Sequence, residues 1–213
     1  MARTDSFGRE VWSRTFIESR GFGYGGAATR GGYIAVGEGR GPVDRREANR
    51  LAVAGQPPWG YYNMLNGPYW RVTDELQSYA KRGLADAPRC DAAYLVKIDP
   101  DGQLDWWHYY RPRNHQTRAF AMACTRDGGY VLCGEITDLT RPRQGRAYLV
   151  KTDGVGHVQW ERILSDGREP STFAAAVKQT HDGGYVLVGS EQGKAVRFIK
   201  TDQHGRVNRT PSR

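Results

Sequence analysis

The sequence predicts an all-β protein built from three repeats of a four-stranded sheet, and three observations support this fold class. A motif that combines an aliphatic run, a D-x-x-G turn and a tryptophan begins at Ala93, recurs at Ala147 and returns in weakened form at Val196. A second motif, centred on Gly-Gly-Tyr, follows each tryptophan in the same order. Glycine accounts for 27 of 213 residues, well above the usual share, as repeated tight turns require.

The first motif predicts two strands and the turn between them. Its copies read AYLVKIDPDGQLDWW, AYLVKTDGVGHVQW and VRFIKTDQHGRVNR, and a shortened copy, RTDSFGREVW, opens the chain. The aliphatic run is typical of a buried strand. In the turn, the aspartate can accept backbone hydrogen bonds and the glycine can adopt a positive φ. A strand that carries the tryptophan follows, at Trp12, Trp106 and Trp160.

The next two strands form a hairpin in each repeat. A small-residue strand comes first, as in AFAMAC and FAAAVKQ, and its alanines predict close packing between neighbouring sheets. The chain then reverses at the Gly-Gly-Tyr motif, read as ATRGGYIAVGE, CTRDGGYVLCGE and QTHDGGYVLVGS. Paired glycines between two apolar runs favour such a hairpin.

These motifs resemble the repeat of bacterial and archaeal β-propeller proteins, in which each copy forms one four-stranded blade. The resemblance covers residues 1–38 and 92–205. It implies a single β-repeat domain over residues 1–213 with three four-stranded blades, whereas propellers usually have four to eight. It implies little about activity, because one fold serves many functions. A β-trefoil-like fold is the alternative, since twelve strands in three repeats also fit it.

The strand count also predicts how the domain ends. We expect the C-terminal run AVRFIKTD to complete the sheet of the N-terminal strands, which gives three sheets of four. Three such sheets would leave faces exposed, so we expect the chain to associate with itself or with a protein partner that covers the open side.

An aromatic-rich insertion, residues 39–91, interrupts the first repeat. It contains two potential short helices around the segment PPWGYYNMLNGPYW. Two interpretations stay open: the rings are buried over one end of the sheets, or they form a recognition surface for a protein or a glycan. The candidate binding residues in this insertion are Trp59, Tyr61, Tyr62, Tyr69 and Trp70.

Basic residues concentrate in two segments, residues 109–146 and the C-terminal tail, and the formal net charge is +8. Arg111 and Arg113 flank one proline, and Arg141 and Arg143 flank another. They form either a solvated rim or a contact for an acidic protein surface, phosphates or anionic headgroups. The sequence disfavours nucleic acid, because these arginines do not alternate with the aromatic residues.

The sequence also bears on the cellular compartment of the protein and on the cofactors that it could bind. No run approaches the ~20 apolar residues of a membrane-spanning helix, and the first residues lack the apolar core of a signal peptide. Cytoplasm is therefore the default location, with an extracytoplasmic one left open. Cys90, Cys124 and Cys133 lack CxxC spacing and predict reduced thiols. Five scattered histidines show no metal-binding spacing, so we expect no metal and no cofactor.

No catalytic motif stands out, and most aspartates belong to turns. Glu38, Glu135 and Glu191 follow or lie near the end of the strand after each Gly-Gly-Tyr turn, where they could line a central channel. The sequence thus predicts a non-enzymatic interaction or scaffolding module, an accessory subunit that docks onto a larger assembly or onto its own copy. A carbohydrate-binding protein is the alternative, and a hydrolase with channel carboxylates is the second alternative.

Overall fold

The fold is all-β in the part of the chain that the structure describes. The structure is a computed structural model that describes residues 1–14, 22–40, 91–112, 115–138, 145–164, 172–191 and 195–207. Within these ranges the regular elements are strands, and none of them is a helix. Accordingly, no helix in these ranges is long and apolar enough to cross a membrane.

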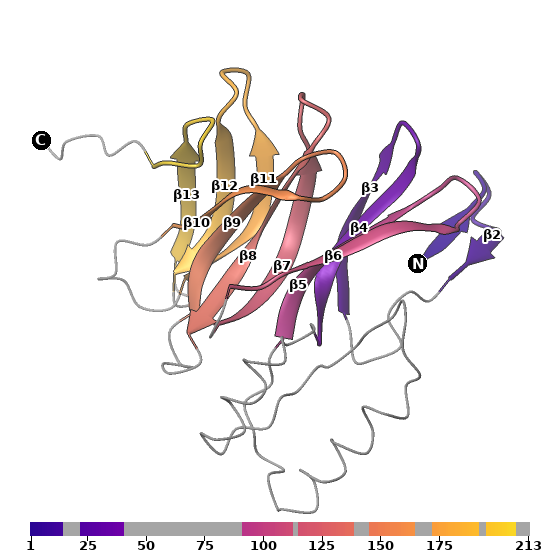
Figure 1. Ribbon diagram of the computed structural model, residues 1–213, viewed down its shortest axis with the longest axis horizontal. Helices are drawn as coiled ribbons and strands as arrows, with labels where there is room; N and C mark the ends of the chain where they lie inside the picture. The colour runs from indigo at the N-terminus through magenta and orange to yellow at the C-terminus, as the bar shows by residue number, and fades with distance from the viewer. Residues whose placement is uncertain are drawn as a thin grey trace, which may run out of the picture.

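Thirteen strands make up the described part of the chain (Figure 1). In chain order they are β1 (Ala2–Thr4), β2 (Glu10–Ser13), β3 (Phe22–Thr29), β4 (Gly32–Arg40), β5 (Asp91–Ile98), β6 (Leu104–Tyr110), β7 (His115–Cys124), β8 (Tyr130–Asp138), β9 (Gly145–Thr152), β10 (Val158–Ile163), β11 (Thr172–Gln179), β12 (Tyr185–Glu191) and β13 (Ala195–Thr201).

These strands form four antiparallel sheets, each made of consecutive strands. The orders are β1-β2, β3-β4-β5-β6, β7-β8-β9-β10 and β11-β12-β13. Figure 1 shows the sheets side by side, from the β1-β2 hairpin at one end to β13 at the other. We call them the N-terminal hairpin, the first sheet, the middle sheet and the end sheet.

The predicted closure of the domain is wrong, and so is the count of three four-stranded sheets. The run AVRFIKTD forms β13, which pairs with β12, with Leu187 opposite Ile199. The N-terminal strands pair with each other instead, as a separate hairpin. The first and middle sheets also begin two strands later than the sequence repeat suggests, because the small-residue strand comes first and the tryptophan strand comes last. Adjacent strands joined by tight turns pair locally, without the cost of closing a long loop.

The D-x-x-G turns form as the sequence predicts. Oδ1 of Asp99 accepts hydrogen bonds from the backbone N–H groups of Asp101 and Gln103, at 2.9 and 2.7 Å. The glycine of each such turn has a positive φ, for example 82° at Gly102 and 86° at Gly156. An L side chain rarely adopts this conformation, which is why glycine recurs at that position.

Alternate residues of each strand face different neighbouring sheets, as a period of two requires. In β8, Leu132 and Ile136 pack against the first sheet, whereas Val131 and Cys133 pack against the end sheet. The alanines of the small-residue strands also enter these cores, at Ala119 and Ala174, as predicted. The middle sheet is thus covered on both faces.

A recurring aromatic contact joins each sheet to the next. Trp106 lies over the turn glycine of the middle sheet, Gly156, and its ring centroid is 5.9 Å from that of Tyr130. Trp12 makes the equivalent contacts with the first sheet, and Trp160 makes them with the end sheet. The repeated tryptophan therefore connects repeats, and the repeated glycine leaves room for it.

The predicted insertion lies between two paired strands. Arg40, the last residue of β4, is opposite Asp91, the first residue of β5. The chain thus leaves the first sheet and returns to it at one point. Residues 41–90, including the two potential helices, lie outside the described residues.

Candidate functional site

The strongest candidate site is the outer face of the end sheet. In the two preceding sheets, the corresponding face is covered by the next sheet. On the middle sheet it consists of four residues that are at most 1% exposed, namely Val131, Cys133, Ala147 and Leu149. Their equivalents in the end sheet, aligned by the repeated motifs, are Val186, Val188, Val196 and Phe198.

This face of the end sheet is open to solvent along its edge strand, β13. Val196 is 73% exposed and Phe198 is 72% exposed, whereas Ala147 and Leu149 are buried. The alternation of β13 explains the contrast, because Ile199 and Thr201 point back into the core shared with the middle sheet. An exposed apolar pair on a face that is otherwise used for sheet packing marks a surface fit for an interaction.

A complementary surface exists at the opposite end of the stack. The small-residue strands β7 and β11 each contact the sheet before them, through Ala119 and Ala174. The equivalent residue of β3 is Gly23, which is exposed. A Cβ at Gly23 would meet only the Tyr94 hydroxyl, at 3.6 Å, so the backbone there is accessible. The N-terminal hairpin packs instead on β5 of this sheet, through Trp12.

A charged cluster lies at one end of the first and middle sheets, with side chains from β4, β5, β7 and β8. Nε of Arg118 is 2.7 Å from Oε2 of Glu38, and the arginine also approaches Asp91 at 3.7 Å and Glu135 at 3.9 Å. The Tyr24 hydroxyl donates a hydrogen bond of 3.0 Å to Oε1 of Glu38. One guanidinium group therefore bridges carboxylates from two sheets.

This cluster contains two of the three predicted channel carboxylates. Burial raises the pKa of Glu38 and of Glu135, and the charge of Arg118 partly opposes the rise in both. The side chain of Glu191 lies outside the described part. A raised pKa suits a general acid, but the guanidinium engages both carboxylates as ion-pair partners. The acid/base hypothesis therefore stays a prediction, and a hydrolysis assay on Glu38→Gln and Glu135→Gln would test it.

At the same end of the sheets, aromatic rings from the small-residue strands β3, β7 and β11 contact one another. The ring centroids of Tyr24 and Phe120 are 5.3 Å apart, and those of Phe120 and Phe173 are 5.7 Å apart. Tyr24 and Phe120 occupy equivalent bulges in β3 and β7, where the strand register shifts by one residue. The bulges turn these rings toward one another, and together with Arg118 they tie the three small-residue strands together.

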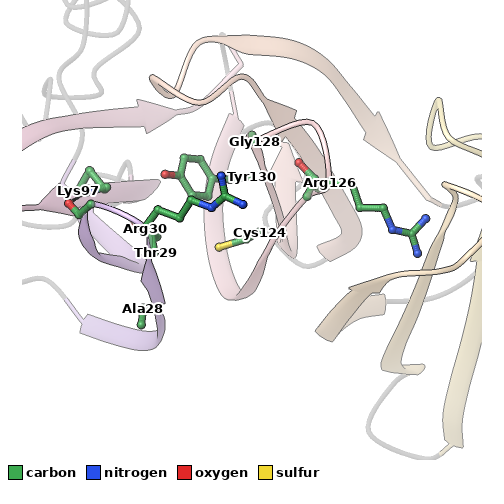
Figure 2. A pocket seen from close by; sticks show the side chains of 11 residues that line it. Ala28, Thr29, Arg30, Lys97, Cys124, Arg126, Gly128 and Tyr130 are labelled. Carbon is green, nitrogen blue, oxygen red and sulfur yellow. Dashed lines mark hydrogen bonds between the residues drawn. The ribbon is translucent and has the colours of Figure 1, made fainter.

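A hollow of about 710 Å³ lies at the opposite end, between the β3-β4 turn and the β7-β8 turn. Its lining includes Thr29, Arg30, Lys97, Cys124 and Tyr130. Figure 2 shows Arg30 extending toward Tyr130 across the hollow, whereas Arg126 points away from it. Nη1 of Arg126 indeed donates to the carbonyl oxygen of His181, at 2.8 Å.

Most of the binding residues predicted from sequence lie outside the described residues. These are Trp59, Tyr61, Tyr62, Tyr69, Trp70, Arg113, Arg141 and Arg143. Arg111 is described, and its guanidinium Nη1 donates a 3.1 Å hydrogen bond to the backbone oxygen of His115. It is partly buried in the β6-β7 connection, so its role in binding stays a prediction.

Sequence reasoning missed the residues that make up the open face and the hollow. Aligning the repeats would have shown Phe198 and Val196 in buried positions of the earlier copies. It would also have shown that the first Gly-Gly-Tyr turn is one residue shorter than the others. Among the described residues, no three His, Cys, Asp or Glu side chains are grouped so that they could hold a metal ion.

Comparisons with known protein families and with curated proteins found no match to this sequence. Any function must therefore be argued from the geometry of the chain itself.

Proposed function

We propose that the protein is a non-enzymatic interaction module of propeller-like repeats, and that it associates head to tail with a second copy of itself. The single observation that carries the proposal is the open face of the end sheet, where Val196 and Phe198 are exposed. The same face is buried in both preceding sheets of the chain.

The sheet arrangement supports the propeller-like part of the proposal. The first, middle and end sheets each consist of consecutive antiparallel strands that begin with the small-residue strand, and these sheets pack face to face. A blade has this organisation. The alternative, a β-trefoil-like fold, would require strands of different repeats to share one barrel, whereas the described strands form four separate sheets.

The second copy is the occupant that best fits the open face. The two interfaces between the first, middle and end sheets each place a small-residue strand of one sheet on aliphatic residues of the sheet before it. Within the described residues there is one uncovered example of each surface: the aliphatic face around Phe198 and the small-residue strand at Gly23. These two surfaces differ, so the contact would be heterologous and would produce rings or open chains.

Sedimentation of the full chain over a range of concentrations tests this association. We expect species larger than the 23.9 kDa monomer, with a share that rises with concentration. Phe198→Asp should abolish them, because a charge would be buried in the apolar contact. Val155→Asp is the matched control, because Val155 is also exposed but lies in a turn of the middle sheet. A wild-type chain that stays monomeric at every concentration would overturn the proposal.

A mixing experiment identifies the two surfaces separately. Phe198→Asp removes the aliphatic face, and Gly23→Asp removes the small-residue face, so neither variant should assemble alone. An equimolar mixture retains one intact surface of each kind and should form a dimer that grows no further. A mixture that contains only monomers would contradict the head-to-tail arrangement.

Carbohydrate binding is the alternative function. It would use the aromatic segment, which lies outside the described residues. A glycan array probed with wild type and with Trp59→Ala tests it, since loss of a glycan signal in the variant would favour a lectin.

A further inference from the structure

Two of the three Gly-Gly-Tyr turns hold an internal carboxylate in the same way. In the turn before Tyr130, Asp127 accepts hydrogen bonds from the Thr125 hydroxyl and from the backbone N–H of Gly129, and forms a 2.8 Å ion pair with Nζ of Lys151. The turn before Tyr185 repeats this arrangement with Asp182, Thr180, Gly184 and Lys200. Each turn therefore directs a hydroxyl, an amide and an ammonium group at one carboxylate.

The remaining turn keeps the hydroxyl and the ammonium group but lacks the carboxylate. It reads Thr29-Arg30-Gly31-Gly32, one residue shorter than Thr125-Arg126-Asp127-Gly128-Gly129, and the missing residue is the aspartate. The equivalence of Thr29 and Thr125 follows from the register, because each lies one residue beyond the strand residue that pairs with the turn tyrosine. The lysine equivalent to Lys151 is Lys97.

In the shorter turn the Thr29 hydroxyl is unsatisfied, and Lys97 is buried with a longer carboxylate contact than its equivalents. The Thr29 hydroxyl is shielded from solvent and has no hydrogen-bond partner in the described part of the chain. Lys97 is only 7% exposed, and its Nζ donates to the carbonyl oxygens of Gly31 and Ile98. Its third acceptor is Oδ2 of Asp105, at 3.5 Å, compared with 2.8 Å for the ion pairs of Lys151 with Asp127 and of Lys200 with Asp182.

Both groups line the hollow described above (Figure 2). The lining contains the cationic residues Arg30, Lys97 and Arg126 and no acidic residue. Asp105 lies outside it, and the guanidinium of Arg126 is bound to His181. Arg30 is exposed and free to move toward a ligand. The hollow is therefore positively charged, and one of its lining residues, Thr29, has a buried hydroxyl without a partner in the described part of the chain, which is costly.

We propose that this hollow binds a small carboxylate ligand whose carboxyl group takes the place of the missing aspartate. One carboxylate oxygen accepts from the Thr29 hydroxyl, the other faces Lys97, and Arg30 closes over the ligand from the solvent side. The donors match a carboxylate because the same pair of groups binds one in the two longer turns. The volume, about 710 Å³, is of the size that takes a small organic molecule.

Ligand-dependent stabilisation of the full chain tests the proposal. Succinate and acetate are the probes, with sodium chloride at equal ionic strength as the reference. A saturating carboxylate should raise the melting temperature by roughly 5 to 10 °C at a hundredfold excess over Kd. Thr29→Val and Arg30→Gln should each weaken binding about tenfold, whereas Arg206→Gln, which removes an exposed charge in the last turn and outside the lining of the hollow, should leave it unchanged. No stabilisation beyond that of chloride would overturn the proposal.

An insertion variant provides the decisive control. Inserting Asp between Arg30 and Gly31 restores the longer turn and supplies an internal carboxylate to Thr29 and Lys97. This variant should melt at a higher temperature than wild type and should no longer respond to succinate. Inserting Asn at the same place restores the length without the charge and should stabilise less. If the Asp-insertion variant still bound succinate with wild-type affinity, the ligand would not occupy the aspartate position and the proposal would be wrong.

Discussion

The contact between each tryptophan and the turn glycine of the following sheet makes a sharp prediction about Gly156. An alanine there would place a Cβ 2.5 Å from Cδ2 of His108 and 2.7 Å from Cζ3 of Trp106. It would also require a non-glycine residue at a φ of 86°. Gly156→Ala therefore combines backbone strain with overpacking between the first and middle sheets.

A second glycine separates these two effects. Gly128 has nearly the same φ, 82°, but a Cβ added to it would meet no atom within 4 Å, so Gly128→Ala has the strain alone. We expect Gly128→Ala to lower the free energy of unfolding by about 1 to 2 kcal/mol. Gly156→Ala should lower it by about 1 to 3 kcal/mol more, because Trp106 and His108 must move.

Thermal unfolding of both variants measures the difference. For a chain of this length, an extra loss of about 2 kcal/mol corresponds to a melting temperature lower by roughly 4 to 8 °C. Near-ultraviolet circular dichroism should in addition report a changed environment of tryptophan in Gly156→Ala alone. Equal melting temperatures for the two variants would refute the idea that the tryptophan contact joins the sheets.

Three further predictions follow from individual contacts. Burial opposes ionisation of Asp127, but hydrogen bonds from Lys151 and neighbouring donors lower its pKa to about 2, so its stabilisation is present above about pH 4 and is lost as the pH falls toward 2. Because the carboxylate is half-exposed, Asp127→Asn should cost only about 1 kcal/mol in urea unfolding at pH 7, and the cost should vanish near pH 2. Thr117 accepts the backbone N–H of Ala93 from the neighbouring sheet, so Thr117→Val should cost about 1 to 3 kcal/mol, with Thr117→Ser close to wild type in the same assay. Burial raises the pKa of Cys133 to about 12, so mass spectrometry should find this thiol unalkylated by iodoacetamide until the chain unfolds; labelling of the native protein would contradict its placement.

The all-β class and the turns could be predicted from the sequence because both depend on local chemistry. The D-x-x-G turn needs only an aspartate and a glycine three residues apart, and Asp99 and Gly102 behave as expected. The grouping of strands into sheets was predicted wrongly, because the AVRFIKTD run contains no residue pattern that specifies the sheet edge with which it pairs. The pairing of β13 with β12 joins two strands that only three residues separate in the sequence.

The candidate sites were harder to predict for a different reason. Phe198 is an ordinary strand residue in sequence, and it becomes notable only because no described sheet covers it. Thr29 is notable only by comparison with Thr125, whose hydroxyl has the aspartate that Thr29 lacks. Both inferences require knowing which residues of different repeats occupy the same place in space.

The stacking of sheets has a consequence for how the protein opens. Each sheet contacts only its immediate neighbours, so the stability of the stack approximates a sum of sheet and interface contributions, like a short one-dimensional chain of coupled units. The middle sheet is held by two interfaces and the end sheet by one. Amide hydrogens of β8 and β9 should then exchange only on global unfolding, while those of β12 and β13 exchange through partial openings from the free end. Covering that end would remove the easiest route by which the fold comes apart.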